Sequence, residues 1–177
     1  MTPGGSTAPL IVTALLPKDL AAWATALRRT HFSPERNYLD AHVTLFHALP
    51  PQCEEEVQGL FRRIAGEVAP VEATLDRVMT LGRGTARAIE CEGIARLRSR
   101  IADHFHGMLT AQDQHRPRLH VTVQNKVSAV DAKALQSELS KDFAPLRFTF
   151  RGLGLYRYCG GPWEAVREFA FRGQGRA

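Results

Sequence analysis

The sequence predicts an α+β fold in which two antiparallel sheets face a central cleft and the helices lie outside. First, a pattern of histidine, aliphatic residue, threonine and aliphatic residue occurs twice, at residues 42–45 and 120–123. Second, short apolar runs rich in β-favouring residues alternate with segments whose apolar residues recur at helical spacing. Third, each half has the order strand, helix, motif strand, helix, strand and strand. These observations together predict a bilobal fold built from a duplicated unit.

The first half begins with an apolar run at residues 10–16, which predicts a buried strand ended by Pro17. The next apolar residues, Leu20, Trp23, Ala24 and Leu27, have helical spacing and predict an amphipathic helix that ends near residues 31–34. The remaining predicted elements of this half are a loop at residues 34–40, the first motif strand at 41–47, a helix after Pro50-Pro51, and strands at 71–81 and 85–91 around a turn at 82–84.

The second half repeats this order after the strand at residues 85–91. Apolar residues at one-turn spacing predict a helix over residues 94–109, and a polar, basic loop at 112–118 leads into the second motif strand. The elements expected after it are a helix at residues 130–143, strands at 147–150 and 153–158, a turn at 160–162 and a last strand at 163–171.

We expect a flexible tail over residues 1–9, which are rich in glycine, serine, threonine and proline, and one bilobal domain over residues 10–177. The pseudo-symmetric halves are predicted to span approximately residues 10–84 and 85–171. The net charge of +5 and a pI near 9.5 favour an anionic partner. A chain of this length can bury a core of its own, and we expect it to act as a monomer.

No apolar run approaches the roughly 18 residues of a transmembrane helix, and the N-terminus lacks the basic residues that open a secretory signal. We therefore expect a cytoplasmic protein with no membrane partner. The three cysteines, Cys53, Cys91 and Cys159, are widely separated and form no CxxC arrangement. This spacing argues against both a disulfide framework and a thiolate zinc site.

The chemistry of the repeated motif follows from strand geometry. Alternate side chains of a strand lie on one face, so His42 and Thr44 share a face, as do His120 and Thr122. Two imidazoles across a cleft can transfer protons in both directions near neutral pH, one as base and the other as acid. Threonine hydroxyls beside them can donate hydrogen bonds to an anion, so a phosphodiester would fit this site.

These two motifs, His42-Val43-Thr44-Leu45 and His120-Val121-Thr122-Val123, resemble the paired signatures of the 2H phosphoesterase superfamily, which includes the 2'-5' RNA ligases and cyclic phosphodiesterases. The resemblance covers essentially the whole chain. It implies His42 and His120 as the acid and base, Thr44 and Thr122 as phosphate ligands, an RNA or nucleotide substrate, and no cofactor or metal. The chain departs from the family pattern at residues 124–126, where Gln124 and Asn125 precede Lys126, so we expect this loop to decide substrate preference.

Other polar and aromatic residues have more than one interpretation. Tyr156, Tyr158 and Trp163 could stack on a base or pack in the fold. The remaining histidines, His31, His47, His104, His106 and His115, lack convincing metal-ligand spacing, and His47 is expected on the face opposite to His42. Basic side chains that could form a positive rim for RNA phosphates, or simply solvated surface charge, are Arg116, Arg118, Lys126, Arg151 and Arg157.

The leading hypothesis is a metal-independent phosphoesterase that acts on 2',3'-cyclic or 2',5'-linked ribonucleotide phosphodiesters, with ligation as the reverse reaction. For opening of a cyclic phosphate, we assign water activation to His120 and protonation of the leaving oxygen to His42, although the symmetry of the motifs does not decide this. One alternative is a nucleotide- or RNA-binding module with little turnover. Another is a metal-dependent hydrolase, which chelation would inactivate.

Overall fold

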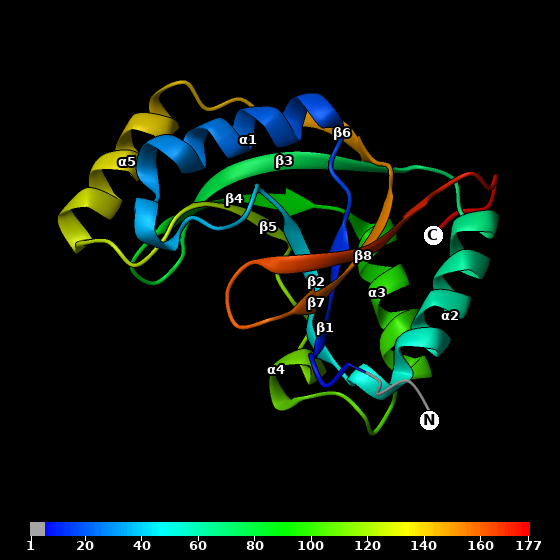
Figure 1. Ribbon diagram of the computed structural model, residues 1–177. Helices are drawn as coiled ribbons and strands as arrows, with labels where there is room; N and C mark the ends of the chain where they lie inside the picture. Colours follow the sequence, from blue (N-terminus) through cyan, green and yellow to red (C-terminus); the bar gives the residue numbers. More distant parts are fainter. Residues whose placement is uncertain (1–5) are drawn as a thin grey trace.

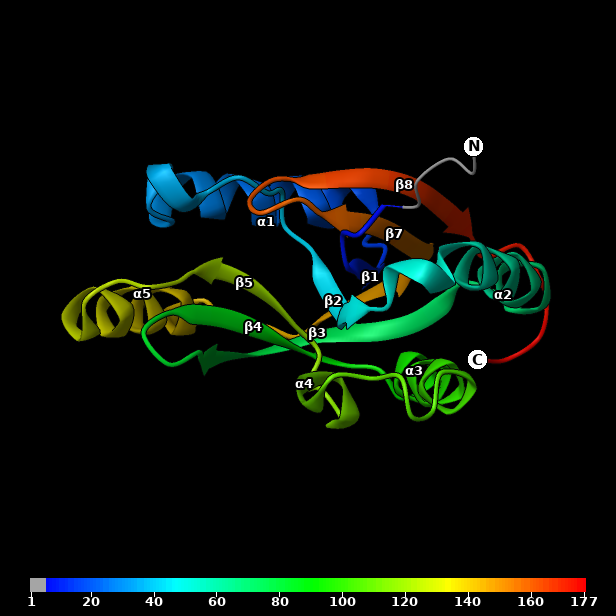
Figure 2. The same ribbon diagram turned by 60° about the horizontal axis from the view of Figure 1, so that its bottom comes forward.

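The computed structural model describes residues 6–177 and contains two four-stranded antiparallel sheets (Figures 1 and 2). The first sheet has the order β2-β1-β7-β8 and the second has the order β5-β4-β3-β6. The strands of the first sheet are β1 (Leu10–Ala14), β2 (Val43–Leu49), β7 (Gly152–Tyr158) and β8 (Trp163–Ala170). Those of the second are β3 (Val71–Thr80), β4 (Thr85–Glu90), β5 (His120–Gln124) and β6 (Leu146–Phe150). The predicted α+β class is confirmed.

The helices pack at both ends of this pair of sheets, with α1 and α5 at one end and α2 and α3 at the other (Figure 1). α1 packs against β5, α5 against β3 and β4, and α2 against β7 and β8. The helices are α1 (Lys18–His31), α2 (Glu54–Glu67), α3 (Glu92–His104), the short α4 (Ala111–Gln114) and α5 (Ala129–Lys141), with 3-10 turns at Pro34–Arg36 and Pro51–Cys53.

Both motif strands occupy equivalent edge positions. β2 pairs with β1 at one end of the first sheet, and β5 pairs with β4 at one end of the second. In each case the partner strand precedes the motif strand in the chain and is connected to it through a helix, α1 or α3. This equivalence is what the repeated order of elements in the sequence predicts.

The sheets do not divide the chain at the boundary between the predicted halves. The first sheet takes β1 and β2 from residues 10–84 and β7 and β8 from residues 85–171, while β3 from the first half joins the second sheet. Each half therefore supplies strands to both sheets. The proposed duplication of residues 10–84 and 85–171 stays a prediction, and neither half forms a sheet of its own.

One hydrophobic core contains residues of both sheets and of three helices. Val43 and Leu45 of β2 are at most 1% exposed, and Val121 of β5 is fully buried in the same cluster. The motif histidines and threonines, on the other face of these strands, are only half-buried. The alternation predicted for the motifs is thus present in both copies.

The predicted helix over residues 94–109 is shorter than expected, since α3 ends at His104. The backbone N–H of Phe105 still donates to Ile101, but Gly107 has a φ of 83°, a left-handed conformation that ends a helix. The predicted loop at residues 112–118 begins inside α4, which Thr110 caps by accepting a hydrogen bond from the backbone of Asp113 at 3.3 Å.

The two ends of the described chain are both attached to the fold. The C-terminal segment returns to the end of α2, where Val68 forms a parallel bridge with Gly175. The predicted tail at residues 1–9 lies partly outside the described residues. In its described part, the carbonyl of Pro9 accepts a hydrogen bond from Tyr158 at 2.9 Å, at the end of β7.

Candidate active site

The two motif histidines are held by the same backbone interaction. Nδ1 of His42 lies 2.8 Å from the carbonyl oxygen of Asp40, and Nδ1 of His120 lies 2.7 Å from that of Arg118. A carbonyl oxygen only accepts, so each Nδ1 carries the hydrogen and Nε2 is the nitrogen that can exchange a proton with a ligand. Each imidazole thus donates a hydrogen bond to the backbone carbonyl of the residue two positions before it in the chain.

The structure brings the two motifs toward one another from different sheets. β2 and β5 lie side by side, and His120 is near enough for its positive charge to lower the pKa of His42. Thr44 lies opposite Thr13 of β1, and Thr122 opposite Ala86 of β4. Thr44 and Thr122 are half-buried, like both histidines. All four predicted site residues therefore belong to the facing edges of the two sheets.

Burial lowers the pKa of His42 to about 4, well below the usual value for histidine. The hydrogen bond to Asp40 opposes this shift, while the positive charges of Arg28, His120 and His47 add to it. His42 is consequently neutral at pH 7, with Nε2 available to accept a proton. In this charge state His42 can accept a proton from a ligand.

An aromatic pocket of about 290 Å³ adjoins His42. The ring centroid of Trp163 lies 4.5 Å from that of His42, and Tyr156 lies 5.4 Å from Trp163. Tyr38, from the loop before β2, also lines the pocket, whereas Tyr158 does not. Gly154 leaves room for this arrangement, because a Cβ there would lie 2.9 Å from the ring of Tyr156. Trp163 and Tyr156 therefore stand where a base could stack.

A second, more basic groove of about 520 Å³ adjoins His120. Arg116 and Arg118 line it, together with Asn125 from the loop after β5. The residues on either side of Asn125 in the chain do not line the groove. Gln124 is buried and accepts a hydrogen bond from Thr85 at 3.0 Å, and Lys126 is exposed. Of the departures from the family pattern at residues 124–126, only Asn125 lines this groove.

His47 also lines the groove beside His120, which the strand alternation alone did not predict. Its ring Nδ1 lies 3.2 Å from the carboxylate of Asp113, and its backbone N–H donates to the same group at 2.9 Å. Burial opposes ionisation of Asp113, but these bonds and one from Ala48 outweigh it and hold the pKa of Asp113 below its usual range. Asp113 thereby attaches β2 to α4, which precedes β5 in the chain.

Two buried arginines connect each motif strand to the other half of the chain. Arg28 of α1 donates to the carbonyl of Thr122 at 3.0 Å and to that of Leu39 at 3.2 Å. Arg98 of α3 donates to the carbonyl of Leu45 at 3.3 Å and also to that of Asp113. Each arginine thus joins the loop before its own motif to the strand that carries the other motif.

The sequence did not single out Arg28, Arg98 or Asp113, although their exposed fractions are only 4%, 6% and 1%. A charged residue on an amphipathic helix is normally a surface residue, so composition and periodicity give no signal for these positions. The two guanidinium groups lie over aromatic rings, Arg28 at 4.2 Å from Phe32 and Arg98 at 4.3 Å from Phe46.

The expected basic rim is only partly present. Arg157 is paired with Glu54 and Glu164, and Arg151 is paired with Glu168 at 3.2 Å. Their charges are therefore compensated within the fold. The cysteines are free thiols, as their spacing predicted, with Cys53 and Cys91 buried and Cys159 exposed.

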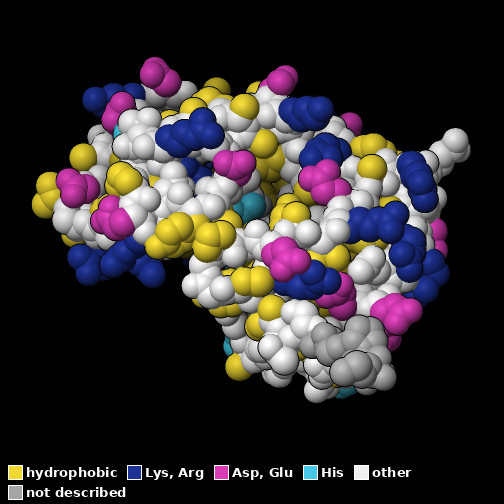
Figure 3. Space-filling model, viewed as in Figure 1, with side chains coloured by type: hydrophobic (Ala, Val, Ile, Leu, Met, Phe, Trp, Pro, Cys, Tyr) yellow, Lys and Arg dark blue, Asp and Glu magenta, His cyan; other side chains and the backbone are white. Residues whose placement is uncertain are grey.

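A space-filling view shows a hollow near the centre of one face, with a histidine side chain inside it and hydrophobic side chains along its rim (Figure 3). Within residues 6–177, no group of three His, Cys, Asp or Glu side chains is arranged to hold a metal ion. No helix in this part of the chain has the length and apolar character needed to cross a membrane.

Comparison with known protein families identifies the family to which this chain belongs. The family model of the 2'-5' RNA ligase superfamily matches residues 16–162, most of the chain, including both motifs. The chain belongs to the 2'-5' RNA ligase superfamily. The resemblance to 2H phosphoesterases is therefore confirmed, and membership in this superfamily supports a phosphoesterase-type activity.

Solved structures similar to this 2'-5' RNA ligase superfamily member share its fold at low sequence identity. They include TT0787 of Thermus thermophilus (TM-score 0.62, 18% identity, covering 94% of this chain and 100% of that one). Others are a phosphoesterase (TM-score 0.60, 18% identity, 96% and 100%) and LigT of E. coli complexed with NADP+ (TM-score 0.55, 17% identity, 94% and 99%). Among curated proteins, no match is found.

Proposed function

We propose that this protein is a metal-independent phosphoesterase that acts on 2',3'-cyclic or 2',5'-linked ribonucleotide phosphodiesters. The observation that carries the proposal is the matched pair of histidines, each with Nδ1 bonded to a backbone carbonyl and Nε2 left for proton transfer. Family membership supports the reaction class, and LigT of E. coli, a structural neighbour, has been crystallised with 3'-AMP and with phosphate.

In the proposed reaction, the phosphate lies between the two Nε2 atoms and the hydroxyls of Thr44 and Thr122 donate to its non-bridging oxygens. Neutral His42 accepts the proton of the attacking water, and protonated His120 donates a proton to the leaving ribose oxygen. The lowered pKa of His42 favours this assignment over the reverse one suggested by the sequence. Ligation uses the same groups in the same roles, with a ribose hydroxyl in place of the attacking water and a ribose oxygen of the cyclic phosphate again as the leaving group.

The surroundings of the two histidines orient the substrate. We propose that a base stacks on Trp163 in the aromatic pocket beside His42, while Arg116 and Arg118 attract further phosphates on the side of His120.

Replacing Trp163 with alanine is then expected to raise KM for a 2',3'-cyclic nucleotide about tenfold, since base stacking on an aromatic ring contributes about 1 to 3 kcal/mol. The matched control is Tyr158→Ala, an exposed aromatic of the same hairpin that does not line the pocket. An equal effect of both substitutions would contradict the stacking role.

The central test is turnover of 2',3'-cyclic and 2',5'-linked substrates in the presence of EDTA. Activity is expected to persist with the chelator and to fall about 10²- to 10⁴-fold in His42→Ala and in His120→Ala, the usual contribution of general acid–base catalysis. His106→Ala, an exposed histidine beyond the end of α3, serves as the control. Activity that survives replacement of both motif histidines would refute the mechanism.

Tight binding of an unreactive nucleotide without turnover from about pH 5 to 8, the range in which a histidine pair should be active, would instead favour a binding module.

A further inference from the structure

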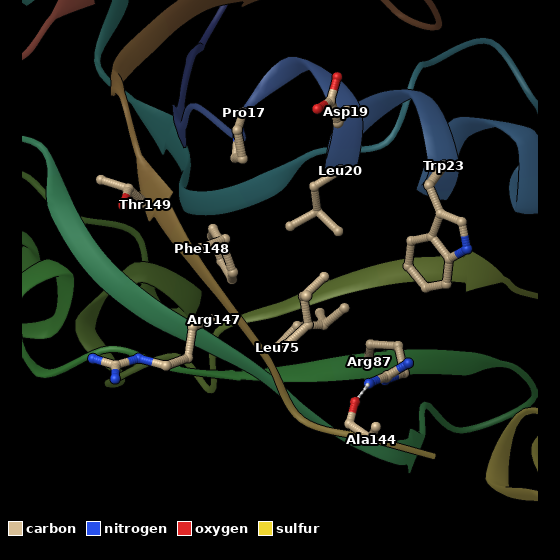
Figure 4. Close-up of a pocket in the computed structure, with 11 residues that line it drawn as sticks. Pro17, Asp19, Leu20, Trp23, Leu75, Arg87, Ala144, Arg147, Phe148 and Thr149 are labelled. Atoms are coloured by element: carbon tan, nitrogen blue, oxygen red, sulfur yellow. Dashed lines mark hydrogen bonds between the residues drawn. The ribbon is translucent and has the colours of Figure 1, made fainter. Parts of the chain in front are cut away.

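A separate pocket of about 570 Å³ lies between α1 and the second sheet (Figure 4). Arg87 of β4 lies opposite Val121 in β5, one position from the pair formed by Ala88 and His120. Successive side chains of a strand point to opposite faces, so Arg87 and His120 lie on opposite faces of the sheet. The pocket shares no lining residue with the candidate active site.

The walls of this pocket are mostly apolar. Leu20 and Trp23 descend from α1, while Leu75 and Phe148 come from β3 and β6 (Figure 4). Trp23 is 39% exposed, although it is among the largest apolar side chains of the protein. The volume is within the roughly 300 to 1,000 Å³ that is typical of small-molecule sites. The pocket is therefore large enough to hold a compact apolar molecule.

Arg87 places a positive charge in this apolar setting. It is 7% exposed and forms no ion pair with any residue of the described chain. The carboxylate of Asp76, which pairs with Arg77 at 3.3 Å, is the nearby negative charge that acts on Arg87. Nε of Arg87 donates to the carbonyl of Asp76 at 2.7 Å and Nη2 to that of Ala144 at 3.5 Å. Within residues 6–177, Nη1 has no hydrogen-bond partner.

Removing a cation from water is unfavourable, and burial lowers the pKa of Arg87. The negative charge of Asp76 opposes this shift. The rings of Phe143 and Trp23, at 5.3 and 6.0 Å from the guanidinium, compensate only in part. No fully buried side-chain nitrogen or oxygen of the described residues lacks a hydrogen-bond partner, so Nη1 of Arg87 is open to solvent or to a ligand. An anionic group there would accept a hydrogen bond from Nη1 and add to the negative charge near Arg87.

We propose that this pocket binds a small apolar molecule with a single anionic group, which accepts a hydrogen bond from Arg87 while its apolar body packs against Leu20, Trp23 and Phe148. Two observations favour one anionic group over several. Asp19 lines the pocket on its α1 side, where its negative charge would repel a second anionic group, and the side chain of Arg147 points away from the cavity (Figure 4) and pairs with Glu72 at 3.6 Å. The ligand class thus differs from the polyanionic nucleotides proposed for the active site.

The test compares two fluorescent probes with the same apolar body. 8-Anilinonaphthalene-1-sulfonate carries one sulfonate, and N-phenyl-1-naphthylamine is the same molecule without it. We expect Arg87→Met to weaken binding of the sulfonate at least tenfold and to change binding of the neutral probe less than twofold. Arg147→Met, which removes an arginine at the rim of the same pocket, is expected to change neither by more than twofold.

Two further variants keep the result decisive. Ala144→Trp places a large side chain at an exposed position of the pocket wall and is expected to weaken both probes at least tenfold, even if Arg87→Met does not fold. Trp163→Ala alters only the aromatic pocket beside His42 and is expected to leave both affinities unchanged. Sulfonate binding that depends on Trp163, or that is insensitive to Arg87 and Ala144, would overturn the proposal. None of these measurements depends on phosphoesterase activity.

Discussion

His42 and His120 have the same backbone bond at Nδ1, but their surroundings differ. His42 packs against Trp163, next to an aromatic pocket, whereas His120 borders a groove lined by arginines. Desolvation is the largest cause of the low pKa of His42. Equal motifs in the sequence thus have different surroundings in the fold.

We predict that His42 titrates with a midpoint near its pKa of about 4 in the free protein. The measurement is an NMR titration of the Cε1–H resonances from about pH 3.5 to 8, which spans both this value and the ordinary histidine value. The His42→Gln variant identifies the signal of His42. A midpoint at or above about 6 would contradict both the low pKa and the assignment of His42 as the base.

The same shift has a consequence for stability. Between about pH 6.5 and 4, the unfolded chain binds a proton at His42 and the folded chain does not, so the free energy of unfolding falls as the pH falls through this window. The slope from one such group is at most about 1.4 kcal/mol per pH unit. Urea unfolding at about pH 7, 6 and 5 should therefore show a weaker pH dependence in His42→Gln than in the wild-type protein.

At the scale of elements, Arg28 makes α1 part of the candidate site. Its guanidinium group joins the carbonyl of Leu39, before the first motif, to that of Thr122, inside the second. Its positive charge also lowers the pKa of His42. The hydrogen bonds of Arg28 and its positive charge are two separate contributions to the site. Different substitutions of Arg28 can distinguish them.

We predict that Arg28→Met raises the titration midpoint of His42, because a nearby positive charge is lost, whereas Arg28→Lys leaves the midpoint closer to its wild-type value. Both should lower kcat/KM by about 10- to 100-fold, since lysine lacks the planar fork that reaches two carbonyls and a small misplacement of catalytic groups is costly. Arg29→Met, an exposed neighbour on the same helix, is the control. Equal midpoints in the Met and Lys variants would show that the charge of Arg28 does not act on His42.

The elements themselves were largely predictable, because apolar periodicity and proline or glycine positions are local signals. Most strands and helices lie where the sequence predicted them, and the exceptions have local causes, such as the left-handed Gly107 after α3. The side chains that connect elements were not predictable. Asp113 and Arg98 are buried only because strands and loops distant in sequence supply their partners, and a single sequence does not reveal those partners.

At the scale of the whole molecule, strand pairing was the main feature that sequence reasoning missed. The repeated order of elements suggests that each half is a unit, yet β7 pairs with β1 across more than half of the chain, and β3 pairs with β4 and β6 of the second half. Such pairings depend on which edges meet after collapse, and the repeat itself carries no information about them. Because strands of both halves share each sheet, the residues of both halves pack into one core.

This sharing of strands predicts how the chain behaves when it is divided at the turn between β3 and β4. A fragment of residues 1–84 keeps β1 and β2 but loses β7 and β8, and its β3 has no partner, so most of its apolar strand surface would be exposed. We expect neither this fragment nor residues 85–177 to show a cooperative unfolding transition alone, whereas an equimolar mixture should recover the near-UV circular dichroism of the intact protein. The intact chain cleaved in the exposed segment at Gly82 and Arg83 is the reference. Cooperative unfolding of either fragment by itself would mean that the halves are independent folding units and that the sharing of strands is not needed for stability.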